Sequence, residues 1–335
     1  MSGLTGYLTN SGTDLSFIFQ SGTTTSNTGF LLSSGSDIST IFKPIAESQG
    51  YRTGLVNSSG QDISTLFNAK TPIPLLINGC SLWLDANDVS KIVKDVSNQI
   101  TTWTDKSTNN FSFTQSGTNT LKPIYTENSL NGKPTIQFTS SKTQHLIGDS
   151  NATNFGIGTN SYALFAVFKT VAGSLNNSIY AKSYYGVGAG RFFIVTESNY
   201  TLNCRFTHAD GTLIPTGTDD FYTYKIISMT INRKIQNKDT NYINGTLFRE
   251  VSYPSSDTTN YTATANRMLI GAYNANATTI QSGYYLNGNI AEIISYTNSY
   301  DMSDATRQTI EGYLAWKWGI QNSLPISHPY YNVAP

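Results

Sequence analysis

The sequence predicts an all-β protein: a two-sheet antiparallel jelly-roll sandwich with one C-terminal helix, preceded by an N-terminal arm of three short repeats. Segments that alternate apolar and polar residues recur from about residue 76 onward, separated by turns rich in Gly and Asn. One phrase occurs three times before residue 72. Alternation with period two is typical of strands with one covered face, and many short strands between such turns favour a sandwich or jelly roll.

The predicted arm, residues 1–72, contains the phrases NSGTDLSFIF, SSGSDISTIF and SSGQDISTLF. An aspartate in each is suited to cap a short helix, because its carboxylate accepts hydrogen bonds from free backbone N–H groups. The residues that follow place apolar side chains on one side of that helix. The predicted docking residues are Asp14, Leu15, Ile18, Phe19, Asp37, Ile38, Ile41, Phe42, Asp62, Ile63, Leu66 and Phe67.

A helix of this length does not persist alone, because nucleation is costly and isolated helices need roughly 12 to 15 residues. Three units on one chain gain from effective concentration once the first has docked. The arm is therefore expected to dock to other proteins or to sister chains. Two alternatives remain open: an accessory layer packed on its own domain, and a mobile linker.

Pro72 and Pro74 mark the predicted boundary with the second domain, residues 76–335, because they interrupt regular structure. The Asn244-Gly245 pair predicts a hairpin with a two-residue turn. The other predicted strands are residues 135–138, 162–169, 191–196, 201–207, 222–231, 268–273 and 289–296.

One helix is predicted near the C-terminus, in SDATRQTIEGYLAWKWGIQN. Ser303 is suited to cap its start and Gly319 to end it. Ile310, Leu314 and Trp318 recur at helical spacing and share one face. The tryptophans are therefore expected to lie in the core, with a ligand platform as the alternative.

Composition excludes some function classes. Charged residues make up 13% of the chain and its net charge is +0, so no basic face for nucleic acid is expected. No signal peptide and no apolar run long enough to span a membrane are visible. The two cysteines do not form a disulfide framework or a metal motif. We expect a protein made in a host cytoplasm.

Several motifs then carry a resemblance: SLWLDANDVS, ITTWTDKSTNNFSFTQ, LNGKPTIQF, YALFAVFKT, NYINGTLF, LNGNIAEIISY and IEGYLAWKWGIQNSLPISHPY. Over about residues 78–332 the chain resembles the concanavalin A-like lectin/glucanase superfamily, in its laminin-G or pentraxin-like branch. The front repeats resemble those in proteins of large DNA viruses. The resemblance implies a curved two-sheet jelly roll and a virion protein. Members of the superfamily include glycan binders, protein binders, glycosidases and structural modules.

Catalytic residues are not expected. A glycosidase needs two carboxylates flanking the sugar bond, and the Glu-x-Asp-x-x-Glu strand of the glucanases that the chain resembles is absent. The glutamates stand singly, and Glu292 is the nearest to an isolated buried acid. His145, His208 and His328 are scattered, so we expect them to be structural or surface residues.

Two pairs of residues are candidates for binding a ligand or a metal ion. Tyr184 and Tyr185 in YYGVGAGR belong to a binding rim or to a plain loop before a strand. Asp85 and Asp88 supply oxygen atoms that would suit calcium, the one cofactor considered. The alternative for both, and for Asp105, is a turn in which carboxylates accept backbone N–H bonds.

The predicted function is a non-enzymatic structural or surface protein of a virion, whose arm docks to other virion proteins or forms a homo-oligomer. The alternative is a glycan-binding adhesin for host attachment, in which loop aromatic and amide side chains bind the sugar. A glycoside hydrolase is a third hypothesis. No nucleic-acid partner is expected.

The docking hypothesis predicts the effect of shortening the three repeat phenylalanines. Phe19→Ala, Phe42→Ala and Phe67→Ala should each weaken assembly, because each removes a ring worth about 3 to 5 kcal/mol in a packed site. The triple variant should be the weakest, because the gain in effective concentration is lost as well. Co-purification with particles, or sedimentation for self-association, measures assembly. A triple variant that assembles like the parent would exclude docking, and an early melt of the sandwich would identify an accessory layer.

Overall fold

The computed structural model describes residues 20–21, 30–31, 72–172, 174, 176–182, 192–197, 201–206, 217–218, 221–252, 258–261, 267–276 and 278–335. The chain divides into two compact units, Met1–Pro72 and Ile73–Pro335. In the first unit, β1 (Gln20–Ser21) pairs antiparallel with β2 (Phe30–Leu31). The predicted docking residues of the repeats, from Asp14 to Phe67, lie outside the described residues.

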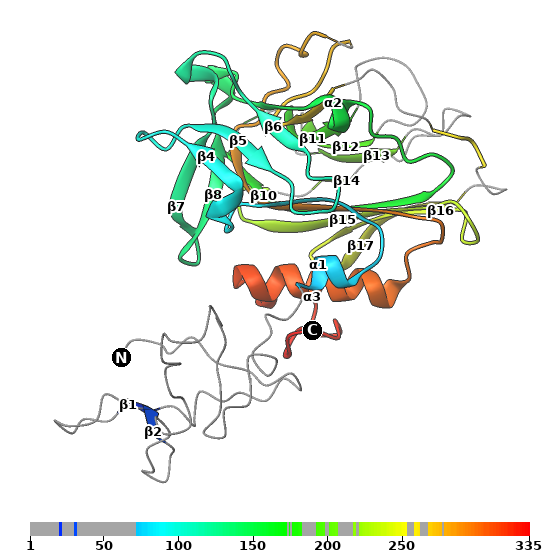
Figure 1. The fold of residues 1–335 in the computed structure, drawn as a ribbon. Helices are drawn as coiled ribbons and strands as arrows, with labels where there is room; N and C mark the ends of the chain where they lie inside the picture. The colour runs from blue at the N-terminus through cyan, green and yellow to red at the C-terminus, as the bar shows by residue number, and fades with distance from the viewer. Residues whose placement is uncertain are drawn as a thin grey trace, which may run out of the picture. The chain divides into compact units, whose positions relative to one another are not determined.

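The second unit contains two antiparallel sheets that pack face to face (Figure 1). Among the described residues, one sheet has eight strands in the order β17-β16-β15-β10-β19-β8-β7, with β3 also paired to β19. These strands are β3 (Cys80–Asp85), β7 (Ile124–Leu130), β8 (Lys133–Phe138), β10 (Ser161–Thr170), β15 (Lys225–Asn232), β16 (Lys238–Ile243), β17 (Thr246–Ser252) and β19 (Gly288–Asn298).

The other sheet, as far as it is described, has nine strands in the order β14-β13-β12-β11-β18-β9-β6-β5-β4. They are β4 (Ile92–Lys94), β5 (Ile100–Thr104), β6 (Ser112–Thr114), β9 (Leu146–Gly148), β11 (Asn177–Lys182), β12 (Phe192–Glu197), β13 (Thr201–Phe206), β14 (Gly217–Thr218) and β18 (Met268–Ile270). The helices are α1 (Ile73–Leu76), α2 (Ser150–Thr153) and α3 (Asp304–Trp318), with short 3-10 helices η2 (Val89–Lys91), η3 (Asn119–Leu121), η4 (Ser140–Lys142) and η6 (Gln321–Ser323).

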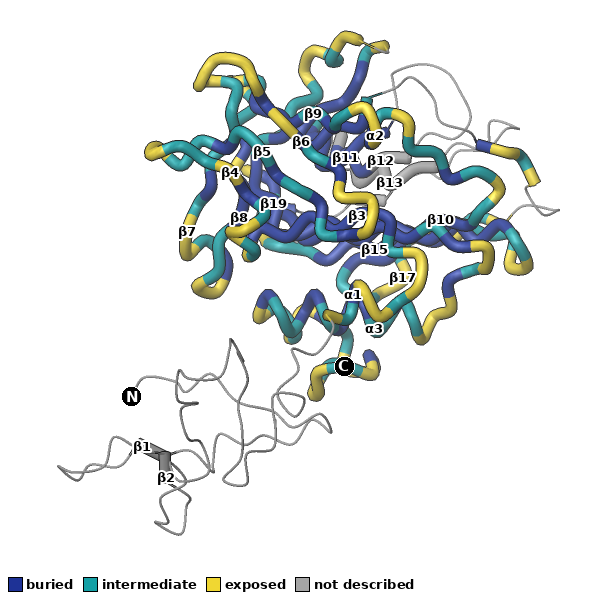
Figure 2. Tube along the Cα trace, viewed as in Figure 1, coloured by how far each residue is buried: buried dark blue, intermediate teal, exposed yellow. Residues whose placement is uncertain are grey.

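Strands β10 and β19 form the centre of the eight-stranded sheet. They pair over their whole length, with Phe165 opposite Ile294. Nearly every residue of both strands is buried (Figure 2). One face of this sheet packs against the nine-stranded sheet to form the core, and helix α3 lies along the opposite face (Figure 1). Burial on both faces explains the continuous apolar run YALFAVF of β10, whereas β19 also buries polar residues such as Glu292 and Ser295.

Helix α3 begins and ends as predicted. The Ser303 hydroxyl accepts a hydrogen bond from the Thr306 N–H, and Gly319 adopts the left-handed conformation with φ of 68°. Ile310, Leu314 and Trp318 are fully buried, which confirms that this face belongs to the core. None of the helices in the described part of the chain is long and apolar enough to cross a membrane.

The predicted hairpin is also confirmed. Asn244 and Gly245 connect β16 to β17 with φ values of 50° and 76°. Two consecutive positive φ values are required by the turn type that matches the twist of paired strands, and Asn-Gly adopts it with little strain. The sequence therefore specifies the register of this pair locally.

The predicted fold class, an all-β two-sheet sandwich with a C-terminal helix, is confirmed for the second unit. The predicted strand ends differ from the observed ones by up to three residues, and most where β15 begins at Lys225 and β18 ends at Ile270. Pro74 does not interrupt regular structure but lies within α1. Proline is tolerated there because the N–H groups of a first helical turn have no intrahelical partner.

Trp318→Ala is expected to reduce the free energy of unfolding by about 3 to 5 kcal/mol, as for other core aromatics. The side chain is fully buried between α3 and the sheet, so its removal leaves a large cavity. Chemical denaturation measures the loss, with the half-buried Trp316→Ala on the same helix as a milder comparison. Normal stability combined with lost ligand binding would instead identify Trp318 as a ligand platform.

Candidate functional site

A buried ionic network joins α3 to the eight-stranded sheet, and its centre is Glu292 of β19. We call it the Glu292 network, and it consists of Trp83, Asp85, Asp88, Lys106, Glu292, Tyr313, Lys317 and Trp318. The sequence singled out Glu292 as an isolated acid. The structure confirms its burial, with no exposed surface, and surrounds it with donors.

Both oxygen atoms of Glu292 are saturated. Oε1 accepts from Trp83 Nε1 at 2.6 Å and from the Tyr313 hydroxyl at 3.0 Å. Oε2 accepts from Trp318 Nε1 at 2.6 Å and pairs with Lys317 Nζ at 2.8 Å. A carboxylate has about four acceptor positions. None is left to take a proton from a substrate, as a general base must.

Opposite charges alternate outward from Glu292. Burial raises the pKa of the Glu292 carboxyl, and the Lys317 ammonium opposes that rise. Lys317 Nζ also lies 2.8 Å from Asp85 Oδ1. Lys106 Nζ then lies 2.9 Å from both Asp85 and Asp88. Burial acts to lower the pKa of Lys106, but the two carboxylates outweigh it and the pKa is raised.

Asp85 and Asp88 come together as the calcium prediction required, but the pair does not fit a calcium ion, because the Lys106 ammonium supplies the positive charge between them. The carboxylates instead accept backbone N–H bonds: Asp85 from Asn87 at 3.0 Å and Asp88 from Ser90 at 3.2 Å. These are the bonds of the turn-forming alternative.

Asp105 has the same role. Its carboxylate accepts from the N–H groups of Trp83, Ser107 and Phe111 at 2.6, 2.7 and 3.3 Å. Tyr184 and Tyr185 lie outside the described residues. Within the described ranges, no three His, Cys, Asp or Glu side chains gather where they would hold a metal ion.

A second buried acid, Glu311, fixes the other side of α3. It accepts from Ser228 Oγ at 2.7 Å and from Arg307 Nη1 at 2.6 Å. His328 Nδ1 accepts from the Tyr330 N–H, so the His328 proton lies on Nε2 and is donated to Glu311 at 3.2 Å. Glu311 therefore anchors the chain after α3 as well as the helix.

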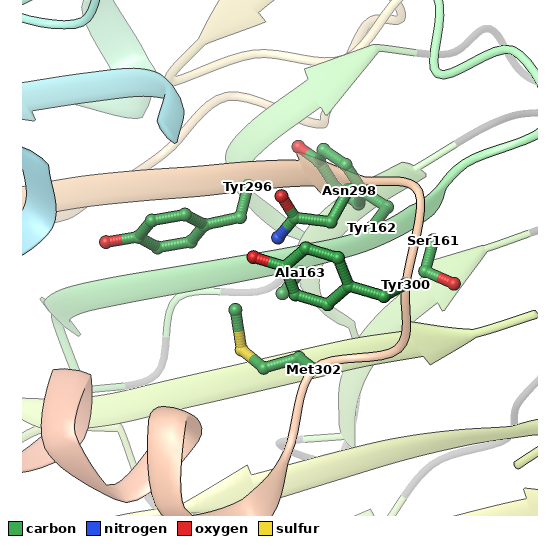
Figure 3. Close-up of a pocket in the computed structure, with 7 residues that line it drawn as sticks. All are labelled: Ser161, Tyr162, Ala163, Tyr296, Asn298, Tyr300 and Met302. Carbon is green, nitrogen blue, oxygen red and sulfur yellow. The ribbon is translucent and has the colours of Figure 1, made fainter. Parts of the chain in front are cut away.

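A shallow hollow lies where β10 begins and β19 ends (Figure 3). Its lining residues are Ser161, Tyr162, Ala163, Tyr296, Asn298, Tyr300 and Met302. It encloses almost no volume, whereas ligand pockets begin at roughly 300 Å³. The nearby Asp301 carboxylate accepts three N–H groups of residues 234–236 and the Ser161 hydroxyl. The hollow is therefore part of a rigid turn.

A different group of side chains lies on the outer face of the nine-stranded sheet. Arg267 and His145 immediately precede the paired strands β18 and β9, in which Leu269 lies opposite Ile147. Side chains alternate along a strand, so Arg267 points to the side opposite the core-facing Met268. This side of the sheet is not covered by α3 (Figure 1).

The loop after β18 adds aromatic side chains to this face. The Leu286 N–H donates to the Gly271 carbonyl at 2.9 Å, which holds Tyr284 and Tyr285 beside the end of β18. The rings of Tyr285 and His145 are 6.0 Å apart. We call Gln115, His145, Arg267 and Tyr285 the aromatic–arginine cluster, while the neighbouring Tyr284 packs instead against Tyr273.

The protonation state of the aromatic–arginine cluster follows from its hydrogen bonds. His145 Nδ1 donates to the Thr143 carbonyl at 2.8 Å, so Nε2 is the acceptor for Gln115 Nε2 at 3.1 Å. Burial lowers the pKa of His145, with a smaller effect from Arg267. Burial raises the pKa of Tyr285. At neutral pH, Arg267 therefore contributes the charge of the cluster.

No family model and no curated protein matches this chain. Solved structures that resemble it include the binding domain of Paraclostridial Mosquitocidal Protein 1 (12% identity, 71% of this chain, 52% of that chain, TM-score 0.48). The botulinum neurotoxin serotype D binding domain also resembles it (13% identity, 71% of this chain, 52% of that chain, TM-score 0.47). So does a Trypanosoma rangeli sialidase (10% identity, 84% of this chain, 37% of that chain, TM-score 0.40).

This chain spans about half the length of the toxin chains that it matches. Identities and TM-scores of this size do not identify a shared function. The solved structures include several toxin binding domains together with a sialidase. Membership of the concanavalin A-like superfamily stays a prediction.

The sequence did not point to the aromatic–arginine cluster. Gln115, His145 and Arg267 come from three distant segments, and only Gln115 belongs to a motif that carries the resemblance, as the last residue of ITTWTDKSTNNFSFTQ. The paired tyrosines of QSGYYLNG resemble many other Tyr residues of this Tyr-rich chain. One signal in the sequence could have been used. Arg267 stands directly before the apolar run MLIGAY, and no acidic residue follows it in that run to pair with its charge.

Glu292→Gln is expected to reduce the free energy of unfolding by about 3 to 5 kcal/mol, the usual cost of breaking a buried ion pair. The amide NH₂ would face the donors Trp318 and Lys317, and the charge partner of Lys317 would be lost. Chemical denaturation followed by tryptophan fluorescence measures the change. Glu250→Gln is the matched control, because its pair with Lys238 is largely exposed. A cost below about 1 kcal/mol for Glu292→Gln would contradict this role.

Proposed function

We propose that this chain is a non-enzymatic binding protein whose sandwich recognises a glycan at the aromatic–arginine cluster. The observation that carries the proposal is the gathering of the half-buried Tyr285 with His145, Gln115 and the guanidinium of Arg267, on the sheet face that α3 leaves uncovered. Aromatic rings pack against the apolar faces of a sugar, and the Arg267 guanidinium and the Tyr285 hydroxyl would provide directional hydrogen bonds. Gln115 and His145 bond to each other and to the backbone, so their role is to support the site rather than to bind the sugar hydroxyls.

The buried acids support binding over catalysis. Glu292 uses its acceptor positions on four donors of the protein, and Glu311 is held by Ser228, Arg307 and His328. Hydrolysis of a glycoside needs one carboxyl group to protonate the leaving oxygen and another to act as base or nucleophile. Glu292 and Glu311 contribute to stability instead.

A second function is favoured by the threefold repeat of residues 1–72. We propose that this arm docks to partner proteins or to sister chains while the sandwich carries the binding surface. Three equivalent Asp-capped phrases supply three attachment points on one chain. Location in a virion remains a prediction from the resemblance. The two functions are compatible, because they use different parts of the chain.

A glycan array with the full chain tests the sandwich proposal. We expect binding to a defined set of glycans, and Tyr285→Ala should weaken it about tenfold, which corresponds to about 1.4 kcal/mol. Tyr300→Ala is the matched control, because Tyr300 is 49% exposed and lies in the hollow of Figure 3. Its affinity and the melts of both variants should match the parent. An array with no bound glycan, or equal losses in the two variants, would refute the proposal.

A further inference from the structure

We infer that Arg267 is a carboxylate-binding residue and that the aromatic–arginine cluster takes an acidic sugar, a uronic or sialic acid. This inference rests on the proposed glycan-binding function and names the class of glycan. It follows from the hydrogen bonds that Arg267 lacks, from the charges around it and from the rings beside it.

Two donor atoms of Arg267 have no acceptor. Nε and Nη2 are shielded from solvent and neither makes a hydrogen bond within the structure. These two nitrogens lie on the same edge of the guanidinium, where their N–H bonds run side by side. That edge matches the two oxygen atoms of a carboxylate and forms a bidentate pair with it.

No acid in the described part of the chain forms an ion pair with Arg267. The titratable groups that influence it are His145 and Tyr285, both neutral at pH 7 by the shifts given above. A shielded donor without a partner destabilises the folded state, and more so when it is charged. A ligand carboxylate would restore the missing hydrogen bonds and balance the charge.

The other buried arginines show what a structural role looks like in this fold. Arg233 donates to the carbonyls of Gly158 and Asn160 at 3.1 and 2.9 Å and stacks 4.4 Å from the centre of the Tyr261 ring. Arg307 pairs with Glu311 at 2.6 Å. Arg233 Nε also lacks an acceptor, but both terminal nitrogens of Arg233 are bound to carbonyls. Arg267 has no comparable carbonyl or carboxylate partner in the described structure, and both Nε and Nη2 lack an acceptor.

The rings beside Arg267 distinguish an acidic sugar from a bare anion. Tyr285 influences the guanidinium electrostatically, and its ring lies 6.0 Å from that of His145. A sugar offers a carboxylate to the guanidinium and a C–H face to an aromatic ring at the same time. Because Nε and Nη2 are shielded, binding requires the flexible Arg267 side chain to turn this edge toward the ligand.

Titration calorimetry of the full chain with defined probes tests the inference. The probes are the methyl glycoside of N-acetylneuraminic acid, methyl glucuronide, the methyl ester of that glucuronide, and methyl galactoside. We expect binding of at least one acidic probe, and a loss of about tenfold or more in Arg267→Gln. If the glucuronide binds, its ester should be weakened to a similar degree. Arg249→Gln, an exposed arginine on β17, is the matched control and should bind like the parent.

Thermal melts provide a readout that does not depend on the ligand. Removal of an arginine with shielded, unpartnered donors should leave the melting temperature of Arg267→Gln within about 2 °C of the parent, or raise it. A fall of more than about 4 °C would assign Arg267 a structural role and overturn the inference.

The outcomes separate this inference from the proposed function. Binding of neutral glycans alone, or equal affinity of Arg267→Gln and the parent for the acidic probes, would overturn the acidic-sugar inference and leave glycan binding intact. Absence of binding to every glycan on the array and to all four probes would overturn both.

Discussion

The fold of the second unit depends on the buried carboxylate of Glu292. Its two oxygen atoms accept from Trp83 on β3 and from Trp318 on α3, so one side chain ties the first strand of the sandwich to the central strand and to the helix. A buried charge is costly unless it is paired and fully hydrogen-bonded. The helix can therefore dock in one position, the one in which Tyr313, Lys317 and Trp318 all reach Glu292.

Much of this architecture was predictable from the sequence, because the relevant signals are local. β10, β19 and α3 have long patterns of apolar residues. The turn at Asn244-Gly245 is predictable because both residues readily adopt positive φ values. Strands such as β6 and β9 have three residues each, too few to show alternation. The order of strands in each sheet was not predictable, because pairings such as Glu292 with Asp85 join residues far apart in the chain.

Less of the candidate site was predictable, because which charged side chains form pairs depends on which residues the fold brings together. Asp85 and Asp88 have the spacing of oxygen ligands, but Lys106, from the next part of the chain, neutralises them. The three acids of the Glu292 network thus stabilise the fold. Arg267 is the reverse case. Little in the sequence separates it from other surface residues, but in the folded chain two of its donor nitrogens are shielded and no described acid pairs with it.

The position of β19 also has a consequence for how this protein is made. β19 pairs with β10 on one edge and with β3 and β8 on the other, yet it begins only at Gly288. During synthesis, the eight-stranded sheet cannot close until β19, which ends at Asn298, has left the ribosome. Until then β10 can pair with β15 on one edge but lacks its partner β19 on the other, and such long-range pairing folds slowly and exposes aggregation-prone edges. The yield of soluble protein is therefore expected to depend on chaperones and on growth temperature more than on the stability of the finished sandwich.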